Sequence, residues 1–220
     1  MNSLESSRSL VDQAYDVILD ALCDGTLEAG MRVTQEDIAG RLNVSRQPVT
    51  HALAVLKAQG FLIQSGRQGL TVAAVEPSFF RAVYEFRSVV EALAVRLATP
   101  RLTPETVKHG RALIARGDEA TASGNAAAVL KADMDFHSFI YDLSGNPLVA
   151  DTMRLHWHHL RRAMRQVHKY PGKSLRVWRE HERIFETMTQ GDAKAAAELM
   201  QQHLDCAYAR LAAGGSVDIE

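Results

Sequence analysis

Residues 25–72 read GTLEAGMRVTQEDIAGRLNVSRQPVTHALAVLKAQGFLIQSGRQGLTV, and this segment predicts two short helices followed by a strand hairpin. Thr34 and Ser45 are of the residue types that cap helices, and each precedes apolar residues at helical spacing. Gly60 is expected to end the second helix. Two short apolar runs follow, Phe61–Ile63 and Leu70–Val72, and they are typical of strands. They flank the glycine-containing loop QSGRQG.

A further helix is expected before this segment, because apolar residues recur at helical spacing between Ser9 and the Asp24–Gly25 pair. Residues 9–75 therefore predict three helices and a two-stranded ribbon. This order, with a tight turn between the second and third helices, is that of a winged helix-turn-helix, whose third helix enters the major groove of DNA. The alternative is a small helical domain that binds another protein.

The third helix and the ribbon loop carry the side chains that we expect to contact DNA. The exposed face of the helix offers hydrogen-bond donors to bases and phosphates, and its first amides can hold a phosphate. An arginine close to glycines at the tip of the ribbon is able to reach a phosphate or the minor groove. The expected DNA-binding residues are Ser45, Arg46, Gln47, Thr50, His51, Gly66 and Arg67.

Beyond a junction at residues 73–78, the sequence predicts helices only. Proline and glycine residues separate six helices, expected at 78–98, 104–123, 126–144, 147–169, 174–190 and 192–212. The predicted fold class is therefore mainly α. It comprises an N-terminal winged helix-turn-helix domain in 1–75, an all-helical bundle in 76–212 and a flexible tail in 213–220.

Composition and charge limit the class of protein. The chain has 220 residues, of which 46% are hydrophobic and 23% charged, as in globular proteins. Its formal net charge of −1 excludes strong binding to polyanions through overall charge, although a local basic patch remains compatible with it. The short apolar runs predict no membrane span. The polar N-terminus MNSLESSRSL predicts no export signal, so we expect a cytoplasmic protein with reduced thiols at its two cysteines.

Four polar residues stand on the apolar faces of three predicted helices. Asp133 and His137 are spaced i, i+4 and therefore share one face, while His181 and His203 interrupt the apolar stripes of two later helices. Burying these groups without partners would be costly. Each histidine alone is more often a satisfied core residue, and the Asp–His pair is compatible with a simple hydrogen bond. Together the four residues offer a ligand set that suits Zn²⁺, Ni²⁺, Mn²⁺ or Fe²⁺.

Arg87 is expected on the apolar face of the helix at 78–98, where a guanidinium group needs an anionic partner. Glu91, one helical turn later, would provide that partner within the helix. Alternatively, the fork of donors on Arg87 would bind the carboxylate of a ligand. The spacing alone leaves both interpretations open.

The first domain resembles the winged-helix domain of GntR-type bacterial transcription regulators. The family pattern is matched at Gly25, Leu27, Gly30, Ala39, Leu42, Val44, Ser45, Arg46, Pro48, Val49, Ala52 and Leu53. The sequence departs from it at Ala29, which replaces a proline, and at Thr50–His51, which replace the usual Arg–Glu. The resemblance implies that Arg46 contacts DNA and that Gly66 lies in the wing.

The helical region resembles the FCD effector domain of the FadR-type subfamily, in its shorter branch with six helices. The resemblance rests on the segment DFHSFIYDLSGNPLV at 135–149 and on histidines in EHERIFE and QQHL. It implies one divalent transition metal per chain. The implied ligands are Asp133, His137, His181 and His203. The motif YEFRSVVE at 84–91 resembles the first helix of that domain, which implies a place for Arg87 at the effector.

These observations favour a ligand-responsive transcription regulator rather than an enzyme. We expect a homodimer that binds double-stranded operator DNA and responds to a small carboxylate held by the metal and Arg87. The alternatives are a metal-dependent enzyme that acts on a small carboxylate, and a regulator with a purely structural metal. Against the enzyme, the sequence has no HExxH motif and no evident general base beside the ligands. Whether the regulator represses or activates stays open.

Overall fold

The computed structural model describes residues 8–66, 69–167 and 174–212, and the contacts between residues divide the chain after Val75 into two units. Arg67 and the tail expected at 213–220 lie outside the described residues. Among the described helices, none combines the length and the apolar character that crossing a membrane requires.

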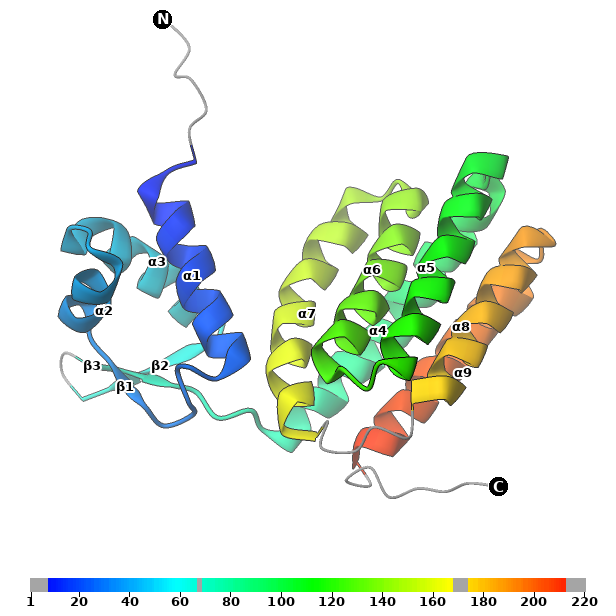
Figure 1. Cartoon of the computed structure of the whole chain (residues 1–220). Coiled ribbons are helices and arrows are strands. Elements are labelled where there is room, and N and C mark those ends of the chain that lie inside the picture. The colour runs from blue at the N-terminus through cyan, green and yellow to red at the C-terminus, as the bar shows by residue number, and fades with distance from the viewer. Residues whose placement is uncertain (1–7, 67–68, 168–173, 213–220) are drawn as a thin grey trace, which may run out of the picture. The chain divides into compact units, whose positions relative to one another are not determined.

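Three helices form most of the first unit: α1 (Leu10–Asp24), α2 (Gln35–Leu42) and α3 (Arg46–Ala58) (Figure 1). The start of α2 is fixed by the Thr34 hydroxyl, which accepts a hydrogen bond from the amide of Asp37 at 3.1 Å. α1 ends at Gly25, whose φ of 77° lies in the left-handed region that favours glycine. The capping residues of the sequence therefore set the boundaries of these helices.

The first unit also contains a short antiparallel sheet. The predicted two-stranded ribbon is present as β2 and β3, and a third strand, β1, was not predicted. The described residues form β1 (Arg32–Val33), β2 (Leu62–Ser65) and β3 (Gly69–Val72), in the order β1-β3-β2. Val33 of β1 pairs with Leu70 and is buried. A strand of two residues shows no alternating pattern, so periodicity alone does not predict β1.

The second unit contains helices and their connections throughout its described part. The helices are α4 (Pro77–Ala98), α5 (Pro104–Ala122), α6 (Ala126–Ser144), α7 (Pro147–Val167), α8 (Ser174–Thr189) and α9 (Ala193–Ala212), with a short 3₁₀ helix, η1 (Thr99–Arg101), after α4 (Figure 1). They correspond to the six predicted helices, with ends that differ by a residue or two. The mainly α fold class is confirmed.

The core of the second unit is built from aromatic and aliphatic side chains of several helices. Phe136 and Ile140 on α6, Trp178 and Phe185 on α8 and Met200 on α9 are all buried. α9 packs against α4 and α8, and α6 packs against α4 and α5. The seam between these helices is where the predicted polar residues meet.

Two glycines allow α5 to pack closely on α8. A Cβ atom at Gly110 would lie 2.2 Å from Cζ of Phe185, and one at Gly117 would lie 2.1 Å from Cε2 of Trp178. Neither distance leaves room for a methyl group. The rings of Phe185 and Trp178 therefore lie against the backbone of α5, and both are buried in the core.

Candidate functional site

Three histidines from three different helices converge inside the second unit. His137 lies on α6, His181 on α8 and His203 on α9, and all three are buried. Each offers one ring nitrogen such that the three atoms lie within 4.8 Å of one another. The Nε2 atoms of His181 and His203 are 3.2 Å apart. Three ligand atoms are thus directed at one small volume.

Asp133 lies beside these histidines, one turn before His137 on α6. Its Oδ1 atom is 3.8 Å from Nε2 of His137 and 3.5 Å from Nε2 of His181. The side chain of Asp133 is 16% exposed, so the cluster reaches the protein surface on this side. The structure therefore brings together all four residues that the sequence analysis singled out as metal ligands.

Aromatic side chains hold the histidine rings in place and exclude water from them. Phe136 stacks on His181 at a centroid distance of 4.5 Å, and Trp157 lies 5.4 Å from His137. Burial lowers the pKa of His181 well below its usual value, and the neighbouring histidines lower it further. Burial also lowers the pKa of His203, against the raising effect of Glu180. Both rings are therefore neutral at pH 7, which is the form that binds metals.

The donor set fits a divalent transition metal. Nε2 of His137 is buried and forms no hydrogen bond with any described residue. Neutral imidazoles and one carboxylate are suitable ligands for Zn²⁺, Ni²⁺, Mn²⁺ or Fe²⁺. A buried nitrogen without a partner, directed at two other ring nitrogens, is costly unless an ion binds there.

A buried ion pair supports His137 from its other side. Oε2 of Glu91 lies 2.5 Å from Nδ1 of His137, and Oε1 of Glu91 accepts a hydrogen bond from Nε of Arg87 at 2.6 Å. Burial opposes the ionisation of Glu91, but the charge of Arg87 and the contact with His137 outweigh it and keep the pKa of Glu91 well below its usual value. The guanidinium group of Arg87 lies over the rings of Tyr84 and Trp157, at 5.1 and 4.5 Å from their centroids.

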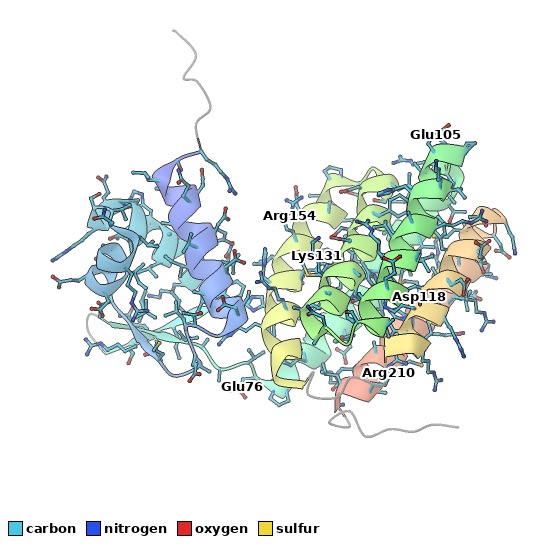
Figure 2. The ribbon with its side chains drawn as sticks, in the orientation of Figure 1. Glu76, Glu105, Asp118, Lys131, Arg154 and Arg210 are labelled. Carbon is cyan, nitrogen blue, oxygen red and sulfur yellow. The ribbon has the colours of Figure 1, made fainter. Side chains whose placement is uncertain are left out.

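A second carboxylate supports His203 in the same way. Oε2 of Glu180 lies 2.8 Å from Nδ1 of His203, and Glu180 accepts two hydrogen bonds of 3.0 Å from Arg210. Arg210 lies on α9 and is labelled in Figure 2. Burial raises the pKa of Glu180, but these contacts lower it to about 2. Neither Glu180 nor Arg210 was predicted from the sequence. Glu180 directly precedes His181 on α8, and adjacent residues of a helix point in different directions. His203 lies on another helix, so helical spacing does not predict its contact with Glu180.

The expected DNA-binding residues lie at the start of α3 and in the β2–β3 hairpin. Arg46 is exposed and its Nη2 donates to Oε1 of Glu36 on α2 at 2.8 Å, while Thr50 donates to the carbonyl of Arg46 at 2.9 Å. Ser45 is at the N-cap of α3, but its hydroxyl accepts no hydrogen bond from the described amides of the helix. Gly66, with a φ of 63°, forms the hairpin turn. Ser45, Gln47, His51 and Gly66 are exposed.

Two family models match the chain, one for each unit. The model "Bacterial regulatory proteins, gntR family" matches residues 10–72, and the model "FCD domain" matches residues 82–205. The match to the second model includes every residue of the histidine cluster described above.

Full-length relatives and solved structures agree with these matches. The chain is 24% identical to the HTH-type transcriptional regulator YdhC of Bacillus subtilis over 201 residues, which cover 89% of each protein. It is 24% identical to the HTH-type transcriptional regulator McbR of Escherichia coli over 208 residues, 91% of this chain and 93% of that protein. A solved structure of E. coli McbR/YncC superposes with a TM-score of 0.82 at 20% identity, covering 94% of this chain and 99% of that one.

Proposed function

Because this chain belongs to the GntR family of bacterial regulatory proteins and carries an FCD domain, we propose that a divalent metal and a small carboxylate bound in its helical unit control its binding to operator DNA. The chain is a DNA-binding transcriptional regulator by family, and not an enzyme. The observation that carries the proposal is the convergence of three buried histidines on one point beside Asp133.

The metal ligands in this proposal are Asp133, His137, His181 and His203. Their burial supports a bound ion, because three imidazoles and a carboxylate gathered without one would lose hydrogen bonds to water and gain few in return. When bound, a divalent ion supplies Lewis-acid affinity for a carboxylate oxygen. The metal is thus proposed as part of an effector site.

Arg87 is proposed as the second contact of the effector. Its Nε atom donates to Glu91, and its two terminal nitrogens are the part of the guanidinium group that would bind a carboxylate. Two parallel donors on a planar group suit a carboxylate. The same Glu91 carboxylate contacts Arg87 and His137, so a ligand that binds Arg87 would act on a residue one contact away from the metal ligands.

A titration of DNA affinity tests the proposal. Operator fragments are selected from random DNA with the purified protein, and their Kd is then measured with metal, with a chelator and with a panel of small carboxylates. We expect one class of acid to change the Kd by about 5- to 150-fold, which is typical of coupling between two sites. Arg87→Lys should reduce the effect of the acid on the Kd, because a single ammonium group cannot provide the two parallel donors of a guanidinium group.

Two outcomes of this experiment would contradict the proposal. If no acid and no chelation changed the Kd, the helical unit would not control DNA binding through this site. If chelation lowered the melting temperature of the protein while acids had no effect on the Kd, the metal would be purely structural.

We also propose that the chain acts as a homodimer through α4. Four large apolar side chains on this helix are exposed, and their spacing of seven, three and four residues places them on one face; they are Phe79, Phe86, Val89 and Leu93. A second copy is the proposed occupant, because two-fold symmetry brings like faces together and winged helices commonly read two half-sites. Val89→Glu should shift the protein towards monomer in sedimentation velocity. Ile63→Glu, at an exposed apolar side chain of β2, is the control and should not.

A further inference from the structure

We propose that two arginine-anchored carboxylates, Glu91 and Glu180, hold His137 and His203 in the tautomer whose Nε2 atom is free to bind the metal. The inference rests on the proposed metal site and deepens it. It assigns Glu91 and Glu180 as positioning residues, which act on the ion through the histidines.

The first arrangement is fully buried. Glu91 is 0% exposed and uses one carboxylate oxygen for Arg87 and the other for Nδ1 of His137. An ionised carboxylate only accepts hydrogen bonds, so Nδ1 must carry the proton. A ring that carries its proton on Nδ1 offers the lone pair of Nε2 to a metal. That atom faces the other two histidines.

The second arrangement repeats the first on other helices. Glu180 comes from α8, whereas His203 and Arg210 both come from α9. The two terminal nitrogens of Arg210 bind the two oxygens of Glu180, and Oε2 also accepts from Nδ1 of His203. Nε2 of His203 is therefore also the unprotonated nitrogen. Ligand histidines that donate their second ring nitrogen to a carboxylate are a recurrent means of fixing tautomer and orientation.

His181 differs from the other two histidines. Its Nδ1 atom is buried and forms no hydrogen bond with a described residue, while its Nε2 atom lies 3.2 Å from Nε2 of His203. No carboxylate of the described residues contacts Nδ1 of His181, so the proposal fixes the tautomers of His137 and His203 only.

Nitrogen NMR of the histidine rings tests this assignment in the full-length, metal-free protein. Long-range ¹H–¹⁵N spectra distinguish the two neutral tautomers. We expect protonated Nδ1 in His137 and His203, both before and after a metal such as Zn²⁺ is added. Protonated Nε2 in His137 or His203 of the metal-free protein would overturn the proposal.

Two isosteric variants test the effect on metal binding. In Glu91→Gln and Glu180→Gln the amide can donate as well as accept, so one tautomer is no longer enforced. We expect each variant to bind Zn²⁺ about 10- to 100-fold more weakly in a competition titration with a chelating dye. The matched control is Glu186→Gln. Glu186 also pairs with an arginine, Arg111, but is exposed and contacts no histidine of the cluster, so its Kd for Zn²⁺ should stay that of the wild type.

The outcomes separate this inference from the proposed function. If the wild type binds no metal, the proposed metal site fails, whereas the tautomers of the metal-free protein remain measurable and still decide the inference. If metal binds but both glutamine variants keep the wild-type Kd and tautomers, the proposed metal site stands and the positioning role is wrong. Should Glu91→Gln fail to fold, Glu180→Gln, which alters a partly exposed carboxylate, gives the same comparison.

Discussion

Nε2 of His181 lies 3.2 Å from Nε2 of His203, although the two residues belong to different helices, α8 and α9. Both rings are buried, and Oδ1 of Asp133 approaches Nε2 of His181 to 3.5 Å from a third helix. An apolar core could replace these groups at lower cost in desolvation. The presence of two imidazoles and a carboxylate at one point in this core is physically reasonable if they bind an ion.

The first prediction concerns metal content. The purified protein should contain about one divalent transition ion per chain, and His137→Ala should lose it because one of the proposed ligands is removed. Elemental analysis measures the content, and thermal unfolding with and without a chelator measures its effect on stability. His109→Ala is the control, since His109 lies on α5 against Phe139 and outside the cluster. Full metal occupancy in His137→Ala would contradict the ligand assignment.

The second prediction concerns the pH dependence of the chelated protein. The pKa values of His181 and His203 are lowered in the folded state, so below about pH 6.5 the unfolded chain binds more protons than the folded one. Stability is therefore fully present above pH 6.5 and falls as the pH decreases, by up to about 1.4 kcal/mol per pH unit for each group. Urea unfolding at pH 7.5 and pH 5.5 measures the change.

Two variants show whether this pH dependence comes from the cluster. His181→Phe replaces one buried imidazole by an apolar ring and should reduce the loss of stability between the two pH values. His109→Ala, outside the cluster, should leave that loss as large as in the wild type. Equal free energies of unfolding at pH 7.5 and pH 5.5 in the chelated wild type would show that the buried rings do not remain neutral.

Much of the fold could be predicted because local signals agreed with the final structure. Proline, glycine and capping residues separate the helices, as at Thr34 and Gly25. The cluster residues were identifiable because a polar residue within an apolar stripe stands out at helical spacing, as His181 does in α8. In both cases the information lies within one helix.

The missed features depend on contacts between segments that are distant in sequence. β1 is too short for a periodic signal and is defined by its pairing with β3. Glu91 was identifiable as a partner of Arg87 four residues away, but its contact with His137 spans 46 residues. The contact of Glu180 with His203 likewise crosses from α8 to α9. Such contacts follow from how the helices pack, which no spacing within one helix determines.

The third prediction concerns the close packing of α5 on α8. Gly110→Ala and Gly117→Ala should each lower the free energy of unfolding by about 1–3 kcal/mol, because the added methyl group must displace the ring of Phe185 or Trp178. Gly40→Ala in α2 is the control. Nothing lies within 4 Å of a Cβ there, so the better helix propensity of alanine should leave stability unchanged or slightly raised. Wild-type stability in both α5 variants would mean that the two helices lie further apart.

The fourth prediction concerns the recognition helix. Arg46→Ala should weaken operator binding by about 1–3 kcal/mol, which is the contribution of one good arginine contact to a base. In the protein without DNA, Arg46 pairs with Glu36 at 2.8 Å, but both side chains are exposed, so releasing this pair to contact DNA costs little. Arg111→Ala removes the same charge from an exposed pair with Glu186 in the helical unit, and should leave the affinity unchanged. A gel-shift titration on the selected operator compares the three proteins. Equal affinity of Arg46→Ala and the wild type would show that α3 does not contact the operator through this residue.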